Sequence, residues 1–477
     1  MRARLAMSNR LFSHLTLIQQ AALQAVDPAA AVRRALSPPP RGEGPGVREP
    51  LPPTPTLPAS GEGAVVILAS GKAAPAMARA AIELVGKRLR GGLVVTRYGH
   101  AAGWQLDPLR VIEAGHPVPD RAGLQAAEAV LDLLGHGPNP PLLQPGDQLL
   151  ALISGGASAL LPLPAARVTL GELQTLTGLL LYSGASIDEI NTVRKHLERL
   201  KGGELARAAV PTRMLALVLS DVVGDRLEVI ASGPTVPDPT TWQAAWQVLE
   251  RYDLVERLPD GVRQRFQAGL AGQIPDTPKP DDPLFERVTT RVIGSNRLAA
   301  QAAVAQAEAL GYRGLLLTTF VEGEARQAGL LAAALAKGVI YQGDPFPAPA
   351  CIVFGGETTV TVRGPGKGGR NQELALAAAL AMEGLPGAAV MALATDGSDG
   401  PTDAAGALVD GSTAARIRQS GSDPDAALAA NDSYPALHSA GALLHTGPTG
   451  TNVNDLTVIL VEATGVHTVG HANLPQR

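Results

Sequence analysis

A glycine-rich loop with two cationic side chains is the segment best suited to chemistry in this sequence. It reads GPGKGGRNQE over residues 364–373, after an apolar run and before a helical pattern. Glycines let backbone N–H groups approach an anion closely, and a helix N-terminus favours negative charge. Lys367 and Arg370, on either side of Gly368, add cationic donors. The loop therefore predicts a phosphate or carboxylate site, with an ordinary glycine-rich turn as the alternative.

The glycine spacing of this loop also matches a dinucleotide-binding fingerprint. Gly364, Gly366 and Gly369 fit the letters G-x-G-x-x-G, which would suit an oxidoreductase. That fingerprint also needs an acidic residue about 20 positions further on, at the end of the next strand. The nearest strand-terminal acid is Asp396, thirty residues after Gly366, and Pro365 lies inside the loop. The match is therefore not specific by itself.

Clustered aspartates follow two other apolar runs. The loop ATDGSDGPTDAAG contains three of them, including Asp396 and Asp399, and LSDVVGDRLEV contains Asp221 and Asp225. Carboxylates this close repel one another unless a cation or a hydrogen-bond donor compensates. Mg²⁺ is commonly held by one or two carboxylates together with substrate phosphates. These loops are therefore candidate metal sites, and a solvated turn with an aspartate capping a helix is the alternative.

Two further loops follow apolar runs in the first half of the chain. ASGKAAP contains Lys72, but Ala73 follows it, so the segment is not a Walker A motif. A lone lysine is more often solvated than functional, and only its loop makes Lys72 a candidate. ISGGASALL lacks the second glycine of a nucleophile elbow. Its small residues are Ser154, Gly155, Gly156 and Ser158.

A cationic helical segment, INTVRKHLERLKGG, leaves two interpretations open. It contains His196 among the basic residues Arg194, Lys195, Arg199 and Lys201. These side chains could form a solvated helix face, or they could form a basic wall for an anionic ligand.

The elements that must position these loops alternate along the chain. AVVILASG, GGLVVTR and DQLLALISGG are apolar runs of strand length, and stretches such as PAMARAAIELVGKRL between them have helical periodicity. Strands that alternate with helices indicate βαβ units and a mainly parallel sheet. Ligands bind at the carboxyl ends of strands in such sheets. We therefore expect a Rossmann-like α/β/α sandwich.

A second alternation of strands and helices begins near Thr289. The stretch 273–285, rich in proline and aspartate, predicts the linker between two halves. We expect an N-terminal domain over residues 1–275 and a C-terminal α/β domain over residues 286–477. A disordered insertion is predicted over residues 37–63, which are dense in proline and glycine and have no hydrophobic period.

Composition narrows the function classes. The net charge is −4 and no long basic run occurs, which disfavours nucleic-acid binding. The single cysteine, Cys351, excludes an intrachain disulfide and a multi-cysteine zinc site. No run reaches the roughly 18 apolar residues of a membrane span, and the N-terminus lacks a signal-peptide pattern. We expect a cytoplasmic protein with no membrane partner.

The loops together favour phosphoryl transfer, which needs positioning and charge neutralisation more than covalent groups. Nine motifs occur in order: SGKAA, GHPVPD, ISGGASALL, INTVRKHLERLKGG, SDVVGDRLEVIASGPTVPD, FGGETTV, GKGGRNQE, TDGSDGPTDAAGA and TGPTGTNVNDL. This ordered set resembles the glycerate 2-kinase family, the class II glycerate kinases with a C-terminal MOFRL domain. The resemblance covers about residues 8–462, and the segment 37–63 departs from the family pattern.

The resemblance implies an enzyme of two domains with its active site in the cleft between them. The family phosphorylates D-glycerate at the 2-hydroxyl to 2-phosphoglycerate, using ATP and Mg²⁺ or another divalent cation. Carried over by motif, Lys72 and Arg370 would neutralise charge on the transferring phosphoryl group or on the substrate carboxylate. Asp221 or Asp225 would orient the substrate hydroxyl or hold the metal ion.

The same resemblance supplies the remaining candidates. Asp396 and Asp399 are alternative metal ligands. The residues expected to cradle phosphates or line the cleft are Ser154, Gly155, Gly156, Ser158, Asn296, Glu357, Lys367 and Gly368. A homodimer is a further expectation.

An NAD(P)H-dependent hydroxypyruvate reductase is the alternative function, because members of the family have carried that name. The missing acidic residue at the fingerprint spacing and Pro365 argue against it.

Overall fold

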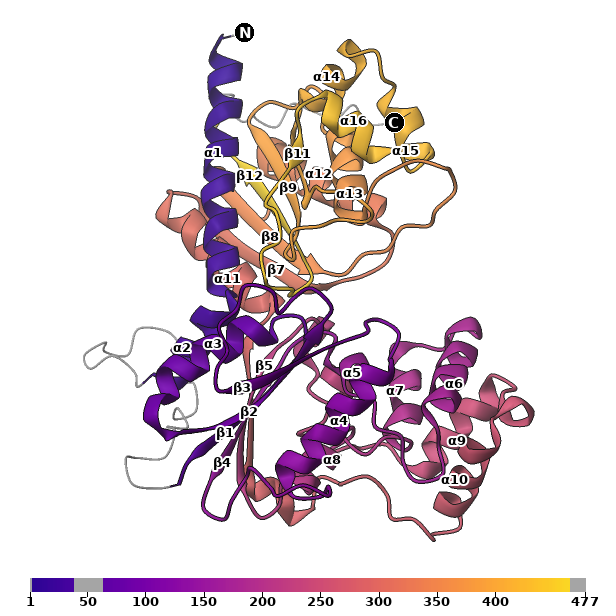
Figure 1. The fold of residues 1–477 in the computed structure, drawn as a ribbon. Helices are drawn as coiled ribbons and strands as arrows, with labels where there is room; N and C mark the ends of the chain where they lie inside the picture. The colour runs from indigo at the N-terminus through magenta and orange to yellow at the C-terminus, as the bar shows by residue number, and fades with distance from the viewer. Residues whose placement is uncertain (1, 38–62, 464–477) are drawn as a thin grey trace. The chain divides into compact units, whose positions relative to one another are not determined.

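The computed structural model describes residues 2–37 and 63–463, which form two compact units (Figure 1). The N unit spans residues 28–293, and the C unit combines residues 1–27 with residues 294–477. The expected domains, 1–275 and 286–477, differ from this division in two places: residues 288–294 add a strand to the N-unit sheet, and the first helix packs with the C unit. The predicted insertion 37–63, apart from its two end residues, lies outside the described residues.

The N unit contains a six-stranded sheet of order β3-β2-β1-β4-β5-β6. The first five strands all pair in parallel. The sheet has a topological switch point between β1 and β4, where the strand order reverses. The strands are β1 (Val65–Ser70), β2 (Leu89–Arg97), β3 (Leu109–Ala114), β4 (Gln148–Ile153), β5 (Arg213–Leu219) and β6 (Val288–Gly294).

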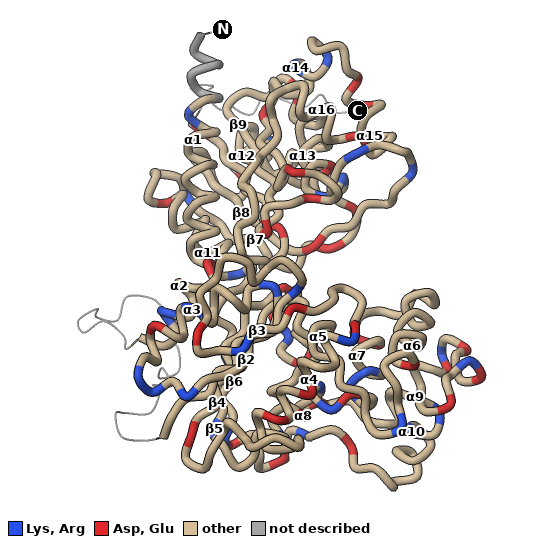
Figure 2. The backbone as a smooth tube through the Cα atoms, in the orientation of Figure 1, with Lys and Arg blue, Asp and Glu red and all other residues tan. Residues whose placement is uncertain are grey.

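Helices cover both faces of this sheet, which confirms the predicted α/β/α sandwich. Figure 1 shows α2 (Pro28–Leu36) and α3 (Ala74–Val85) on one face, with α4 (Arg121–Leu134) and α8 (Glu204–Ala208) on the other. Because both faces are buried, β1 and β4 consist of apolar or small residues almost throughout. Neither strand contains a lysine, arginine, aspartate or glutamate, the residue types that are coloured along the backbone in Figure 2.

A helical lobe follows α5 (Ala157–Leu160) within the N unit and has a hydrophobic core of its own. Capping boxes start its first two helices: Thr169 with Glu172, and Ser186 with Glu189. Hydrogen bonds through Ser232 connect the lobe helix α7 (Ile187–Lys195) to the loop after β4. Its helices are α6 (Leu170–Tyr182), α7 (Ile187–Lys195), α9 (Trp242–Arg251) and α10 (Asp260–Leu270).

The C unit contains a mixed sheet of order β11-β10-β9-β12-β8-β7. β12 is antiparallel to both β8 and β9, so the carboxyl ends of β8 and β9 share an edge with the start of β12. The strands are β7 (Arg313–Val321), β8 (Ala350–Gly356), β9 (Ala388–Ala394), β10 (Gly406–Asp410), β11 (Leu443–Leu444) and β12 (Asp455–Val461).

The helices of the C unit also lie on both faces of its sheet. α1 (Arg2–Ala25) packs against α11 (Asn296–Ala309), and α12 (Ala325–Gln342) with α13 (Arg370–Ala381) covers the other face (Figure 1). Small helices α14 (Thr413–Gln419), α15 (Pro424–Ala429) and α16 (Ser433–Ser439) surround α13. Within the described ranges, no helix has the length and apolar character needed to cross a membrane.

Candidate functional site

Two of the predicted loops meet at the switch point of the N-unit sheet. Lys72 follows β1 and residues 154–158 follow β4, and these two strands are neighbours. The Lys72 N–H donates to the Gly155 carbonyl at 2.9 Å. The buried Ser154 hydroxyl accepts a hydrogen bond from the Ala73 N–H at 3.1 Å. The start of α3 is thereby fixed against the loop after β4.

Glycines allow two further strand ends to contribute side chains to this point. A Cβ atom on Gly155 would lie 2.0 Å from Oδ2 of Asp221, which follows β5. A Cβ atom on Gly156 would lie 3.0 Å from Nε2 of His116, which follows β3, and 3.6 Å from Cγ of Lys72. Four strand ends therefore contribute Lys72, Gly155, Asp221 and His116 to one site in the N unit.

The electrostatic environment of His116 is positive. His116 is half-buried, and its pKa is lowered to about 4 by burial and by the positive charges of Lys72, Arg97 and His100. The imidazole is therefore neutral near pH 7 and can donate or accept a hydrogen bond. His116 was not among the site residues predicted from the sequence. Its position directly after a strand, within GHPVPD, was the signal that could have identified it.

The loop after β4 is supported from within the protein. Ser158 Oγ lies 2.9 Å from Ser232 Oγ, and the Ser232 hydroxyl donates to Asn191 Oδ1 at 2.8 Å. Lys201 Nζ donates to the Ser158 carbonyl at 2.9 Å and lies 2.8 Å from Glu198 Oε2. Burial lowers the pKa of Lys201 to about 8, although Glu198 opposes the shift. The Ser158 hydroxyl is therefore engaged by the protein itself.

A small cavity lies behind this loop, at the level of the sheet. Its volume is about 30 Å³, and its lining includes Ser70, Ser158 and Lys201. The Ser70 hydroxyl is buried and has no hydrogen-bond partner within the part of the chain that the structure describes. Such a space can hold about one water molecule, so the cavity is too small for a metabolite.

Three basic residues of α7 and the segment after it, Arg194, Lys195 and Lys201, are paired internally, so neither interpretation is correct for these three, whereas Arg199 is exposed. Lys195 Nζ lies 3.2 Å from Asp238 Oδ1, and both side chains are buried. Arg194 pairs with buried Glu198 at 3.0 Å. Lys201, described above, also pairs with Glu198.

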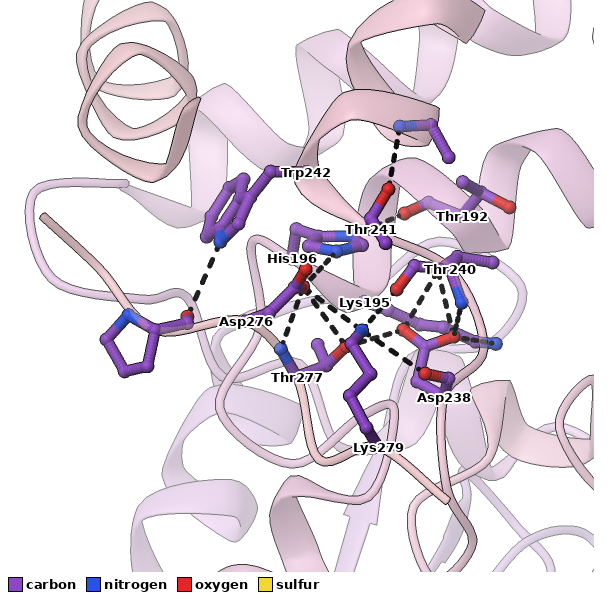
Figure 3. Close-up of polar contacts among 12 residues, drawn as sticks. Thr192, Lys195, His196, Asp238, Thr240, Thr241, Trp242, Asp276, Thr277 and Lys279 are labelled. Carbon is purple, nitrogen blue, oxygen red and sulfur yellow. Dashed lines mark hydrogen bonds and ion pairs between the residues drawn. The ribbon is translucent and has the colours of Figure 1, made fainter. Parts of the chain in front are cut away.

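The same network fixes the predicted linker onto the helical lobe (Figure 3). The Thr277 hydroxyl donates to Asp238 Oδ2 at 2.9 Å, and His196 Nε2 lies 2.9 Å from Asp276 Oδ1. Burial alone would raise the pKa of Asp276, but His196 and Lys279 lower it to about 2. These hydrogen bonds and ion pairs therefore attach this part of the linker to the N unit.

In the C unit, Arg370 is held between two carboxylates. Its Nη1 donates to Glu357 Oε1 at 2.7 Å and its Nη2 donates to Asp455 Oδ1 at 3.1 Å. Glu357 follows β8 and Asp455 begins β12, which explains why both lie at one sheet edge. Asn296 Nδ2 fixes this edge by donating to the Val453 and Asp455 carbonyls at 2.9 and 2.8 Å.

Opposing effects set the ionisation of this cluster. Burial raises the pKa of Asp455 to about 7, although the charge of Arg370 opposes the shift. Burial opposes the protonated form of Arg370, but Asp455 and Glu357 raise its pKa further above the ordinary value. Asp455 was not selected from the sequence. It belongs to the motif TGPTGTNVNDL, where an acid at the start of an apolar run was the available signal.

Asp399 occupies the anion position at the N-terminus of α13. Its Oδ1 accepts the Asn371 N–H at 3.1 Å and its Oδ2 accepts the Gln372 N–H at 2.8 Å. Burial raises the pKa of Asp399, and these hydrogen bonds oppose the shift. A Cβ atom on Gly369 would lie 2.3 Å from Cγ of Asp399. The sequence left two roles open for Asp399, as a metal ligand or as a helix cap. In the structure its carboxylate caps α13.

The other candidates of the C unit lie in exposed or half-buried loops. Lys367 is exposed, with its Nζ 4.5 Å from the centre of the Tyr434 ring. Gly368 packs closely, since an added Cβ would lie 2.2 Å from Ser433 Oγ. Asp396 is half-buried, and its Oδ1 accepts the Ser398 N–H at 3.0 Å.

The structure divides the predicted site residues equally between the units. The N unit contains Lys72, Ser154, Gly155, Gly156, Ser158, Asp221 and Asp225, and the C unit contains Asn296, Glu357, Lys367, Gly368, Arg370, Asp396 and Asp399. Asp225 has a left-handed backbone with φ +54°. Among residues 2–37 and 63–463, no group of three or more His, Cys, Asp or Glu is placed to hold a metal ion.

Strand-end loops that gather lysine, arginine and carboxylates are typical of α/β enzymes acting on small anionic ligands. A domain model described as a domain of unknown function (DUF4147) matches residues 14–267, and the MOFRL family model matches residues 350–455. The D-glycerate 2-kinase of Thermotoga maritima is 47% identical over 85% of this chain and 93% of its own length. The chain belongs to the glycerate 2-kinase family with a C-terminal MOFRL domain.

Two further comparisons agree with this family. A crystal structure of glycerate kinase from Thermotoga maritima has a TM-score of 0.83 and 43% identity, and the alignment covers 95% of this chain and all of that one. A relative from Agrobacterium vitis is 43% identical over 85% of this chain and 89% of its own length. It bears the name of a candidate hydroxypyruvate reductase.

Proposed function

We propose that this protein is an ATP-dependent kinase that phosphorylates D-glycerate at its 2-hydroxyl to give 2-phosphoglycerate. The observation that carries the proposal is a cationic centre at a sheet edge of each unit, Lys72 in one and Arg370 in the other. Phosphoryl transfer needs such charge neutralisation around the transferring group. The identity to a D-glycerate 2-kinase over most of both chains supports glycerate as the acceptor.

Each group of the N-unit site has a role in this reaction. Lys72 would neutralise negative charge on the phosphates, and the backbone at Gly155 and Gly156 would bind their oxygens. Asp221 would orient the 2-hydroxyl of glycerate and accept its proton as the oxygen attacks the γ-phosphorus. The new O–P bond forms while the bond from the γ-phosphorus to the β-phosphate oxygen breaks, and ADP leaves.

A divalent cation fits the residues of this chain only as a partner of the nucleotide. Mg²⁺ usually takes one or two protein carboxylates plus substrate phosphates, and it supplies charge neutralisation on them. Asp225 and Asp396 are half-buried single carboxylates that suit this role. Asp399 suits it less, because both of its oxygens already accept backbone N–H groups.

The decisive assay compares two activities of the purified protein. ADP formation from ATP should depend on D-glycerate, and NMR of the product should identify 2-phosphoglycerate. Oxidation of NAD(P)H with hydroxypyruvate should be at background. Glycerate-independent ADP formation, or reductase turnover alone, would refute the kinase proposal.

Substitutions of the two cationic centres test the role of the site. Lys72→Ala and Arg370→Ala should each lower kcat by about 100- to 1000-fold, the usual cost of losing one charge-stabilising donor. Lys337→Ala, an exposed lysine on α12, is the matched control and should retain full activity. Retained turnover in either site variant would contradict the assignment. A homodimer and a cytoplasmic location remain predictions from the sequence.

A further inference from the structure

The hydrogen-bond donors of Arg370 are only partly used. A guanidinium has five N–H groups. Asp455 takes the side formed by Nε and Nη2: its Oδ2 lies 2.5 Å from Nε, and its Oδ1 accepts from Nη2 at 3.1 Å. Glu357 accepts one hydrogen bond from Nη1 at 2.7 Å. One N–H on each terminal nitrogen has no acceptor among the residues that the structure describes. The Nη1–Nη2 end of the fork is thus only half-filled.

The two carboxylates differ in burial and in how firmly they are fixed. The Asp455 side chain is 10% exposed, whereas the Glu357 side chain is 46% exposed. Asp455 is the first residue of a central strand, and its own carbonyl accepts a hydrogen bond from Asn296 at 2.8 Å. Glu357 follows the end of β8, and its backbone N–H donates a hydrogen bond to the Val321 carbonyl at 2.9 Å. Glu357 can therefore move away while Asp455 stays.

We propose that Glu357 is a placeholder on Arg370: it occupies the position that an anionic group of a substrate takes. Asp455 is the positioning residue that holds the Arg370 guanidinium in its orientation. A carboxylate or a phosphoryl group has two oxygens that can accept hydrogen bonds from Nη1 and Nη2 together, whereas Glu357 accepts one hydrogen bond. The exchange is inexpensive because exposed ion pairs contribute little net stability. This inference rests on the proposed function and gives Glu357 a role different from nucleotide binding.

The substrate anion could come from D-glycerate, through its carboxylate, or from ATP, through its phosphates. Both would use the same two N–H groups, so the chemistry is shared and the measurement must separate the sources. Glu357→Gln keeps the size of the side chain and removes the charge that competes with the ligand. If Glu357 is a placeholder, the substrate that takes its position should bind more tightly to this variant.

The test measures KM for D-glycerate and for ATP separately, with calorimetric Kd values for each ligand alone. Glu357→Gln should lower KM and Kd of one substrate by about 2- to 5-fold, the range expected for an exposed ion pair. Glu383→Gln, which removes the charge from an exposed ion pair with Arg418 in the same unit, is the control and should change neither. A Glu357→Gln protein that binds both substrates as wild type does, or more weakly, would overturn the proposal.

Asp455→Asn tests the positioning role. It should lower kcat/KM by at least about 10-fold, with the larger effect on the substrate identified by Glu357→Gln. The melting temperature of the variant shows whether a loss of activity comes from misalignment of Arg370 or from misfolding. If this variant fails to fold, the Glu357→Gln measurement still tests the proposal. The calorimetric Kd values can be measured even if wild-type protein forms no ADP. Failure of the kinase proposal can therefore be distinguished from failure of the placeholder proposal.

Discussion

Replacing Gly155 by alanine should displace Asp221 and so test whether that carboxylate acts in the reaction. The new Cβ would lie 2.0 Å from Oδ2 and 2.7 Å from Cγ of Asp221, where ordinary contacts begin at 3.4 Å. The carboxylate or the loop must therefore move by at least about 1.4 Å. Gly155 does not have a left-handed backbone, so the effect of alanine is purely steric.

The size of the effect follows from this movement. A misplacement of about 1 Å in a reacting group can cost about 100-fold in rate, so we expect kcat for glycerate phosphorylation to fall by about that factor. Overpacking of a well-packed site costs about 1–3 kcal/mol, which should lower Tm by several degrees without preventing folding. Steady-state ADP formation and a thermal melt measure the two effects separately.

Two comparisons make the result decisive. Gly155→Ala in an Asp221→Ala background should cause little further loss, because the atoms that it displaces are gone. Gly178→Ala, at a helical glycine of α6 whose added Cβ would meet nothing within 4 Å, should leave activity unchanged and raise Tm slightly. If Gly155→Ala retains more than about a third of wild-type kcat, or is equally harmful without Asp221, the role given to Asp221 is wrong.

Three further outcomes follow from the structure. Asp399→Ala should lower the free energy of unfolding by about 1–2 kcal/mol in denaturant titrations, because α13 loses the acceptor of two N–H groups. Lys201→Met should lower the free energy of unfolding, but by less than the roughly 3–5 kcal/mol of a fully unpaired buried charge, because Glu198 loses Lys201 and keeps Arg194 as its second partner. Between pH 6.5 and about 4, the unfolded chain binds a proton at His116 that the folded protein does not, so acid should selectively destabilise wild type. His116→Asn should lack this component, of about 1–2 kcal/mol after allowing for solvent screening, in melts across that pH range.

The N-unit fold was predictable because short stretches of sequence identify its strands. Runs such as VVILAS and QLLALI are buried on both faces and end in small or cationic residues, so strand identity and the position of Lys72 after β1 could be read from the chain. The mixed sheet of the C unit was less accessible. β12 follows all the other described strands in sequence, yet it lies between β8 and β9. Its pairing depends on contacts distant along the chain, which periodicity does not contain.

Long-range contacts also explain why some polar residues were misinterpreted from the sequence. Lys195 could be interpreted as part of a solvated face because its buried partner, Asp238, is 43 residues away along the chain. Asn191 is connected to the loop after β4 through Ser232, which comes from another segment. A sequence displays the charge or polarity of each residue, but only the fold determines whether a partner carboxylate or hydroxyl meets it.

Glycines in the two principal loops make room for protein carboxylates as well as for ligands. The missing Cβ of Gly155 leaves space for Asp221, and that of Gly369 leaves space for Asp399. The two aspartates then differ in function because their surroundings differ: Asp399 is buried with both oxygens bound to α13, whereas Asp221 is only half-buried at a sheet edge. The same glycine pattern therefore stabilises a helix start in one unit and, if Asp221 acts as proposed, places a reacting group in the other. Sequence spacing alone does not separate these outcomes, because the aspartate comes from a different strand end in each case.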